Sequence, residues 1–436
     1  MPPKYNFFRG HPSAELLPAK QVLDATHTVY ERVILDENHY DDVLNRHPLQ
    51  YGCDLGNLEV RTAIADWNTR QFGLKVPSDP RCINMTNGAS YGIMNILAQT
   101  TSPHNGLTRR AFLVTPTYFL INTTFIDAGF GGKLSGIEEL EDGQIDLDEF
   151  ARQLEYYDSL EEIRSPTEED LKAIQHPKKL PKKIYRYVLY VTPTFSNPRG
   201  GTLTAETRYK LVELARKHDM LIICDDVYDL LDYTVPSTET PKLVPRIVYC
   251  DKETLTDPNS PGNTVSNATF SKLVGPGLRV GWQETVSPTL TKLIDQGGAH
   301  ISGGSPAHTN SVIIGELIVS GEMDKIVTGL REAYTERSKA LHEAVEKYMP
   351  KGTVVSGGDG GYFVWVTLPE EYDCRLSCEK AAEQGLLLAN GDHFEVVGDS
   401  RGWGSRAARL SLSFLSQEAI VEGIKLWGQI CNQCRK

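Results

Sequence analysis

The stretch Thr269-Phe-Ser-Lys272-Leu-Val-Gly-Pro-Gly-Leu-Arg279-Val-Gly281 decides how the fold of this 436-residue chain is interpreted. It follows the apolar run Val265–Ala268, which is predicted to be a strand buried on both faces. Lys272 is therefore expected at the carboxyl edge of an open α/β sheet, where ligands bind. A lysine amine held at this edge can form a Schiff base with one carbon of a cofactor.

Candidate phosphate donors surround this lysine. Thr269 and Ser271 carry hydroxyls, and Arg279 carries a guanidinium that can bind a phosphate through two hydrogen bonds. Gly275 and Gly277 let the backbone turn back toward the same place. The segment therefore indicates a phosphorylated cofactor bound to the lysine. The simpler alternative is a surface lysine beside a glycine turn.

The overall composition is that of an ordinary folded protein with more than one domain. Its 45 Lys and Arg against 57 Asp and Glu give a net charge of −12, which argues against nucleic acid or an anionic membrane as partners. No apolar run approaches the ~20 residues that span a bilayer, and Met1–Pro18 has no signal-peptide core, so a cytoplasmic location is expected. Cys431 and Cys434 have CxxC spacing without a second ligand pair, and no metal site is expected.

Apolar, strand-like runs alternate with helical segments in the middle of the chain. This alternation is typical of a mainly parallel sheet with helices on both faces. Strands are predicted at Cys82–Met85, Ala111–Val114, Tyr187–Val191, Leu221–Cys224, Val265–Ala268 and Val280–Trp282, and helices at Gly92–Thr100 and Ala205–His218.

Two segments are predicted to be surface insertions. Residues 158–183 are strongly charged, and within them Ser165-Pro-Thr-Glu168 is predicted to form a capping box at the start of a helix. Residues 233–263 are rich in Pro, Thr, Ser and Asn and are predicted to loop over the surface.

The character of the sequence changes from about Val312. Long amphipathic helices are followed by a glycine-rich strand at Gly357–Val366 and by a final helix from Gln417. We therefore predict a large domain of residues 49–311 and a smaller domain that combines residues 1–48 with residues 312–436.

Six further motifs occur in order along the chain. They are Tyr51-Gly52 with Gly56 and Arg61, Asn87-Gly88-Ala89-Ser90, Pro116-Thr-Tyr118, Thr192-Pro-Thr-Phe-Ser-Asn197-Pro-Arg-Gly200, Cys224-Asp225-Asp226-Val-Tyr228 and Arg409-Leu-Ser-Leu-Ser413. Together with the lysine segment they resemble the class I/II aminotransferase family of fold-type-I pyridoxal-phosphate enzymes. Within it the chain is most similar to the branch of 2-aminoadipate, kynurenine and valine–pyruvate aminotransferases. The resemblance covers nearly the whole chain, from Asn6-Phe-Phe-Arg-Gly-His-Pro12 onward.

The resemblance implies an α/β fold and a bound pyridoxal 5'-phosphate. The large domain is expected to hold a mostly parallel seven-stranded sheet flanked by helices, beside a smaller α+β domain. Tyr51 matches the tyrosine that reaches the cofactor phosphate of a neighbouring subunit, so a homodimer with a shared active site is expected. Gly88, Ala89 and Ser90 open a helix whose backbone N–H groups can bind the phosphate. The branch often has Ser-Gln at the last two positions.

The cofactor ring is expected between an aromatic residue and a carboxylate. Tyr118 matches the residue that stacks on the ring, although Thr115 stands where the family commonly has Glu. Asp225 matches the carboxylate that keeps the ring nitrogen protonated, and Asp226 is the alternative. Tyr228 matches a donor to the ring oxygen.

The substrate is expected on the other side of the lysine. Arg409 matches the arginine that clamps the substrate α-carboxylate, and Asn197 matches an amide that meets both this carboxylate and the ring oxygen. Gly10 of the entry segment is expected beside the substrate. A dicarboxylate substrate would need a second cation, for which Arg9 and His11 are candidates.

The resemblance implies an aminotransferase that acts on an α-amino acid and a 2-oxo acid, with Lys272, Asp225 and Tyr118 as catalytic residues. One alternative is a β-eliminating lyase of the cysteine-S-conjugate type, since elimination uses the same cofactor motifs. A more remote alternative is a non-enzymatic effector domain of a transcription regulator. Such regulators carry a DNA-binding module ahead of this fold, and the recognisable fold is expected to begin near Asn6.

Overall fold

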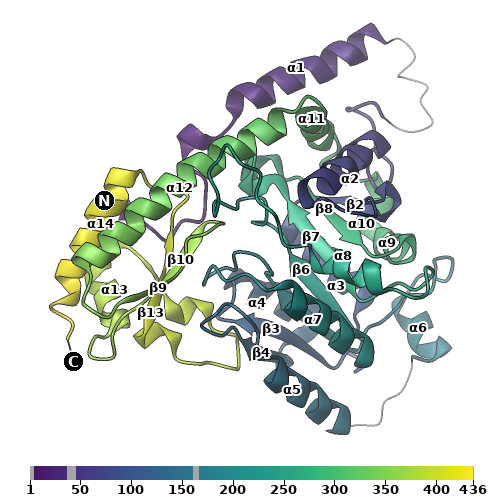
Figure 1. The fold of residues 1–436 in the computed structure, drawn as a ribbon. Coiled ribbons are helices and arrows are strands. Elements are labelled where there is room, and N and C mark those ends of the chain that lie inside the picture. Colours follow the sequence, from purple (N-terminus) through teal and green to yellow (C-terminus); the bar gives the residue numbers. More distant parts are fainter. Residues whose placement is uncertain (1–3, 37–45, 161–165, 436) are drawn as a thin grey trace.

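The computed structural model describes residues 4–36, 46–160 and 166–435. Figure 1 shows a large part built around one sheet and a smaller part beside it with a second sheet. The large sheet has seven strands in the order β2-β8-β7-β6-β5-β3-β4. These strands are β2 (Ile83–Thr86), β3 (Arg110–Thr115), β4 (Leu134–Glu138), β5 (Tyr187–Val191), β6 (Met220–Asp225), β7 (Thr264–Thr269) and β8 (Gly281–Thr285).

The large sheet is mostly parallel, as predicted. Only β8 runs antiparallel, and it does so to both of its neighbours, β2 and β7. The edge strand β4 was not predicted, because its sequence Leu-Ser-Gly-Ile-Glu contains no continuous apolar run. The strand β8 extends beyond its predicted end through Gln283 and Glu284. These polar side chains are tolerated in a buried strand because they find partners, such as the Gly92 carbonyl for Gln283 and the Tyr249 hydroxyl for Glu284.

The central strands are buried on both faces. On β6, Leu221 and Ile223 pack into one hydrophobic cluster, whereas Ile222 and Cys224 pack into another on the opposite face. This double burial explains why these strands are continuous apolar runs. The first face is covered by α3 (Ala89–Thr100), α4 (Leu120–Phe125) and α9 (Pro288–Asp295), and the second by α5 (Leu147–Leu160), α7 (Ala205–Lys217) and α8 (Ile247–Thr254).

The two predicted insertions differ from the sequence predictions. Residues 233–263 are not loop throughout, since they contain α8, which packs against α7. Ile247 and Cys250 pack into one hydrophobic cluster and Val248 into another, so this short apolar run is sufficient to bury the helix. The loop prediction is therefore wrong for this stretch.

The capping box of the charged insertion lies two residues later than predicted. Thr167 caps α6 (Glu168–Ile174), with its hydroxyl accepting from the Asp170 backbone N–H at 3.2 Å while the Asp170 carboxylate accepts from the Thr167 N–H at 2.9 Å. The box shifts because the helix begins at Glu168, so that Asp170 occupies its third position. Ser165 lies outside the described residues.

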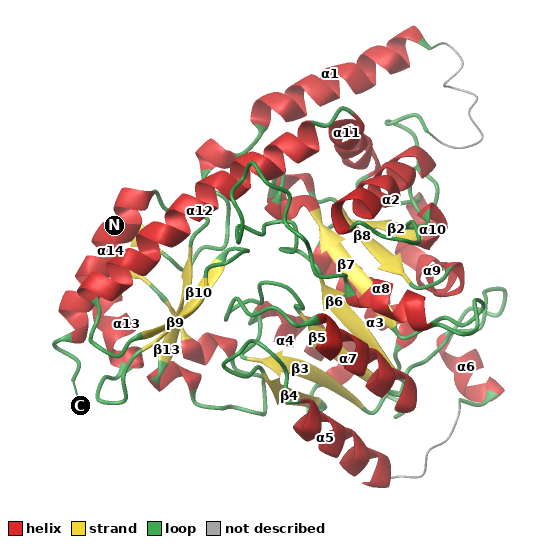
Figure 2. Cartoon of the chain, in the orientation of Figure 1, coloured by secondary structure: helices red, strands yellow, loops and turns green. Residues whose placement is uncertain are grey.

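The smaller part contains a four-stranded antiparallel sheet in the order β12-β13-β10-β9, drawn in yellow in Figure 2. The predicted final helix is confirmed as α14, which begins at Gln417 and packs against α12 and α13. The elements are α12 (Glu322–Tyr348), β9 (Val354–Gly357), β10 (Phe363–Thr367), α13 (Cys374–Glu383), β12 (Ala389–Asn390), β13 (Ala407–Ser411) and α14 (Gln417–Cys431). A two-stranded parallel sheet joins β1 (Tyr5–Asn6) to β11 (Leu386–Leu387).

The single glycine-rich strand predicted at Gly357–Val366 is wrong. The segment contains the end of β9 and most of β10, which pair antiparallel with each other. Gly357, the last residue of β9, and Gly358 and Gly361 after it adopt positive φ, at 83°, 104° and 68°. Glycine adopts this backbone region at low cost, so the glycines reverse the chain here.

The N-terminal region contacts both parts of the molecule. β1 belongs to the smaller part, whereas α1 (Ala19–Leu35) runs along α11 (His308–Val319), with Arg32 and Glu316 forming an ion pair. α11 in turn packs against α2 (Leu58–Phe72) of the large part, which also carries α10 (Gly298–Gly303). The division into residues 49–311 and residues 1–48 with 312–436 stays a prediction, and residues 1–3 and 37–45 lie outside the described residues.

Among the described helices, none has the length and apolar character needed to cross a membrane.

Candidate active site

A cavity of about 470 Å³ lies where the carboxyl ends of β6 and β7 face the smaller part of the molecule. Most of the residues predicted for the site line this cavity, although they come from distant segments of the chain. These residues are Gly10, Ala89, Ser90, Tyr118, Asn197, Asp225, Tyr228, Thr269, Ser271, Lys272, Arg279 and Arg409. The fold therefore brings the predicted residues together in one place.

One end of the cavity carries hydroxyl and guanidinium donors. The Thr269 and Ser271 hydroxyl oxygens lie 2.9 Å apart at the end of β7, and the Arg279 Nη1 lies 3.5 Å from the Ser271 hydroxyl. α3 begins at Ala89 beside them, so its first backbone N–H groups are available to an anion. This donor set matches a phosphate.

Gly88 does not itself line the cavity, but any side chain at this position would clash with Arg279. Its φ is +85°, and a Cβ at this position would lie 2.6 Å from the Arg279 Nη2. A side chain would therefore displace the guanidinium from the start of α3. Arg279 also has a positive φ, of 55°, and donates to the Asn87 carbonyl at 3.2 Å.

Lys272 lies half-buried in the cavity wall, with its Nζ 3.5 Å from the Gly10 carbonyl oxygen. Loss of surrounding water lowers the pKa of its amine to about 8, because burial disfavours the charged form. The positive charges of Arg409 and Arg279 lower this pKa further, and the nearby Asp225 carboxylate opposes them. The neutral form, which a nucleophile or base needs, is therefore much more populated near physiological pH than it is for a lysine with the ordinary pKa of 10.5.

Asp225 ends β6 with one carboxylate oxygen satisfied and one free. Its Oδ2 accepts a hydrogen bond from the Tyr190 hydroxyl at 2.7 Å, whereas its buried Oδ1 has no partner among the described residues. Burial raises the pKa of this carboxyl to about 6, against the opposing influence of Tyr190 and Lys272. The unsatisfied oxygen in the cavity wall matches the protonated ring nitrogen of the cofactor.

Asp226 does not line the cavity. Its Oδ2 accepts from the Ser266 hydroxyl at 2.6 Å, and burial raises the pKa of its carboxyl while the Arg246 guanidinium lowers it. Of the two neighbouring carboxylates, only Asp225 faces the place where a cofactor ring would lie.

Arg409 lies on β13 and lines the same cavity. Its Nη1 donates to the Asn197 Oδ1 at 3.1 Å, and its Nη2 donates to the Phe8 carbonyl at 2.6 Å. The guanidinium also stacks 4.0 Å from the centroid of the Phe363 ring. Burial lowers the pKa of this guanidinium to about 10, and its buried Nε has no partner among the described residues. A buried cation with a free donor is suited to a carboxylate.

Two tyrosines also belong to the site. Tyr118 and Tyr228 both line the cavity, and burial followed by the Asp225 charge raises the pKa of both hydroxyls, that of Tyr118 to about 12. Both therefore stay protonated and can donate hydrogen bonds at neutral pH. Tyr51, in contrast, lies outside the cavity and is 77% exposed.

The sequence predictions missed part of the lining. Arg9 and His11, considered there as a second cation, do line the cavity, and the Arg9 guanidinium lies 5.1 Å from the centroid of the Phe414 ring. The sequence did not indicate Phe363 as a site residue, because its contact with Arg409 depends on the pairing of β10 with β13. The residues not predicted are Phe8, Pro12, Phe119, Leu120, Val227, Pro276 and Phe363.

Comparisons with known proteins identify the family of the chain. Residues 20–424 match the family model described as aminotransferase class I and II. The chain therefore belongs to this family and is a pyridoxal-5'-phosphate-dependent aminotransferase. It is 47% identical over 434 residues to an uncharacterized protein of Saccharomyces cerevisiae, covering 98% of this chain and 96% of the relative. It is 29% identical over 388 residues to aromatic-amino-acid aminotransferase 1 of Thermococcus litoralis, covering 88% and 81%.

Solved structures show the same fold. A multiple substrate aminotransferase from Thermococcus profundus superposes with a TM-score of 0.75 at 24% identity, over 98% of this chain and 91% of that one. An alpha-aminoadipate aminotransferase from Thermus thermophilus, complexed with N-(5'-phosphopyridoxyl)-L-leucine, superposes with a TM-score of 0.73 at 21% identity, over 98% and 92%. The prediction of the fold-type-I architecture is thus confirmed.

Proposed function

We propose that this enzyme transfers an amino group between an α-amino acid and a 2-oxo acid, and that Lys272 holds the cofactor as a Schiff base. The observation that carries the proposal is that Lys272, Asp225 and Arg409 line one cavity. The lysine with its lowered pKa thus lies near both a free carboxylate oxygen and a buried, partly unpaired guanidinium. A reactive amine, a partner for the ring nitrogen and a carboxylate clamp are the three groups that transamination requires.

Each remaining group has a proposed role in holding the cofactor. Thr269, Ser271 and Arg279 bind the phosphate together with the N–H groups at the start of α3, which Gly88, Ala89 and Ser90 form. Tyr118 covers the ring, and Tyr228 and Asn197 donate to the ring oxygen. The cofactor, when bound, supplies an electron sink for the α-carbon of the substrate.

The proposed proton transfer belongs to Lys272. Once the substrate amine has replaced it, the neutral Lys272 amine would take the proton from the substrate α-carbon and, as a general acid, would deliver it to the cofactor carbon to which the lysine was attached. Asp225 keeps its negative charge opposite the ring nitrogen. Arg409 and Asn197 hold the α-carboxylate, with Gly10 beside it, so that the α-carbon stays within reach of Lys272.

The cavity also supports a proposal about the substrate side chain. The cavity wall includes Phe8, Phe119, Leu120 and Phe363, and the Phe8 and Phe119 rings lie 5.9 Å apart. Such a wall stabilises a large apolar or aromatic side chain by removing it from water. The T. litoralis relative is named for aromatic amino acids, which supports this proposal.

We also propose that the enzyme works as a cytoplasmic homodimer with a shared active site. Tyr51 is outside its own cavity and highly exposed, as expected for a residue that serves a second subunit. Leu49 lies beside it in the sequence and is 70% exposed. Burial of such side chains between two copies would remove apolar surface from water.

The reaction is tested by incubating the enzyme with amino acids, including cysteine conjugates, without any 2-oxo acid. Transamination leaves the cofactor in its amine form after one half-reaction, so the conversion stops at one equivalent per site. A β-eliminating lyase would instead regenerate the aldehyde form and release ammonia and pyruvate continuously. Sustained ammonia release would therefore replace the proposed reaction by elimination on the same fold.

A further inference from the structure

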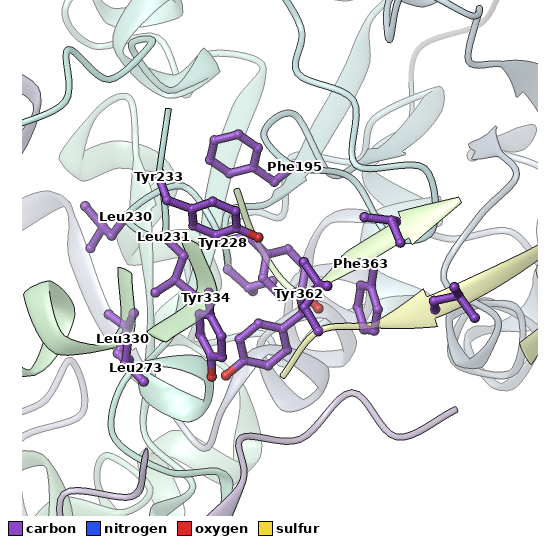
Figure 3. Packing of buried hydrophobic residues seen from close by; sticks show 14 of the residues in the cluster. Phe195, Tyr228, Leu230, Leu231, Tyr233, Leu273, Leu330, Tyr334, Tyr362 and Phe363 are labelled. Carbon is purple, nitrogen blue, oxygen red and sulfur yellow. The ribbon is translucent and has the colours of Figure 1, made fainter. Parts of the chain in front are cut away.

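Four buried tyrosines belong to one hydrophobic cluster, and we call them the tyrosine cluster: Tyr228, Tyr233, Tyr334 and Tyr362. Two of them, Tyr228 and Tyr362, have their rings within 6.0 Å of the Lys272 Nζ. Figure 3 shows that Tyr228, Tyr334 and Tyr362 lie close together, although they come from distant segments of the chain. The Tyr362 ring is at the centre of the contacts, with centroid distances of 5.4 Å to both Tyr228 and Tyr334. Its side chain is fully buried, so its position is fixed by packing.

Tyr362 contacts Lys272 at both ends of the lysine residue. Its hydroxyl donates a hydrogen bond of 2.8 Å to the Lys272 backbone carbonyl. Its ring lies near the side-chain amine, with the ring centroid 5.5 Å from the Lys272 Nζ. One tyrosine therefore restrains the lysine backbone and borders the space in which the amine moves.

Tyr362 is also tied to the sheet that carries Arg409. Its own carbonyl accepts from the Leu412 N–H at 2.8 Å, and the next residue, Phe363, begins β10. Phe363 stacks on the Arg409 guanidinium, and β10 pairs with the strand that contains this arginine. Two consecutive residues thus contact the reactive lysine and the carboxylate clamp.

We propose that Tyr362 is a positioning residue that sets the place of the Lys272 amine relative to Arg409. The inference rests on the proposed roles of these two residues. The substrate α-carbon is held at a fixed distance from Arg409 by its own carboxylate. The lysine can move the α-proton only when its amine lies close to that carbon, and small displacements of reacting groups cost much of the rate.

The test compares Tyr362→Phe with Tyr233→Phe. Tyr233 is a matched control, because it is buried in the same cluster and donates to a backbone carbonyl, that of Gly361, at 3.1 Å. Both variants lose one buried tyrosine hydroxyl and keep the ring. Only the first loses a contact with Lys272.

The measurements are the single-turnover rate of the holoenzyme with an amino acid and the amino-acid concentration at half-saturation. We expect Tyr362→Phe to lower the rate by ~10-fold while half-saturation stays within about twofold, since Arg409 and Phe363 are intact. Tyr233→Phe should leave both values within about twofold of wild type. Replacement of Tyr362 by p-aminophenylalanine, which restores an N–H donor, should recover most of the rate.

The proposal is overturned if Tyr362→Phe and Tyr233→Phe have the same rate. It is also overturned if Tyr362→Phe does not fold while the control does, because the hydroxyl would then serve folding rather than the placement of Lys272. Borohydride reduction of the wild-type holoenzyme separates this result from a failure of the proposed function. Absence of cofactor on wild-type Lys272 would contradict the proposed function itself.

Discussion

Asp225 and Asp226 are consecutive residues, yet only Asp225 faces the cavity. Asp225 accepts from Tyr190 and keeps its second oxygen free, whereas Asp226 accepts from Ser266 on the other side of the strand. Successive side chains of a strand point to opposite faces, so the end of β6 sends the two carboxylates in different directions.

This relationship predicts different results for the two amide variants. Asp225→Asn should lower kcat by ~100-fold or more, because it removes the negative charge opposite the ring nitrogen, while the dissociation constant of the cofactor changes much less. Asp226→Asn should lower thermal stability, since its carboxylate is buried in a network with Arg246, but keep kcat per bound cofactor within a few-fold. A larger loss of kcat in Asp226→Asn than in Asp225→Asn would show that Asp226, and not Asp225, is the charge partner of the ring nitrogen.

Lys272→Ala should abolish turnover and the visible absorbance of the covalently bound cofactor, because Lys272 is the only lysine among the described residues that line the cavity. The variant should still fold and bind cofactor noncovalently through the phosphate donors. Borohydride reduction followed by peptide mapping should place the cofactor on Lys272 in the wild type. Label recovered on another lysine would contradict the mechanism.

The pH dependence of Schiff-base formation should reflect the lowered pKa of Lys272. The neutral amine is the nucleophile, and its pKa is about 8 rather than the ordinary 10.5. The initial rate at which cofactor-free enzyme attaches pyridoxal phosphate should therefore rise with pH, with a midpoint near 8, and level off above it. Trapping by borohydride at timed intervals measures this rate. A midpoint near 10 would mean that the amine is fully hydrated.

Gly88→Ala should weaken cofactor binding. The new Cβ would lie 2.6 Å from the Arg279 Nη2, and alanine at a φ of +85° is strained. We expect the dissociation constant of pyridoxal phosphate to rise by ~10-fold or more, as after loss of one charge-assisted hydrogen bond. Gly277→Ala, in the turn just before Arg279, is the control, because a Cβ there has no heavy atom within 4 Å. Equal losses in both variants would exclude the contact with Arg279 as the cause.

Arg409→Lys should raise KM for amino acids by ~10- to 100-fold, because lysine keeps the charge but loses the planar pair of donors for a carboxylate. Arg406→Ala is the control, since Arg406 is exposed and does not line the cavity, and its guanidinium lies 4.5 Å from the centroid of the Trp403 ring. It should leave KM within about twofold. An unchanged KM in Arg409→Lys would place the carboxylate elsewhere.

The sequence predicted the large sheet well because the signals there are local. Continuous apolar runs such as Tyr187–Val191 are buried on both faces, so their composition alone identifies them. The edge strand Leu134–Glu138 and the polar end of β8 were missed because neighbouring strands and side-chain partners stabilise them. The turn between β9 and β10 was missed because glycine marks both bulges and reversals.

What the sequence determined by itself was the chemistry available along the chain: the lysine after a strand, the hydroxyls beside it, and the ordered motifs that identify the family. These depend on residues a few positions apart. The tertiary structure decided which of them act together. The Arg409 guanidinium donates a hydrogen bond to the carbonyl of Phe8, which lies 401 positions away in the sequence. The Tyr362 hydroxyl donates a hydrogen bond to the carbonyl of Lys272, which lies 90 positions away. Such contacts depend on the pairing of strands and on the packing of one sheet against another, which no local pattern encodes.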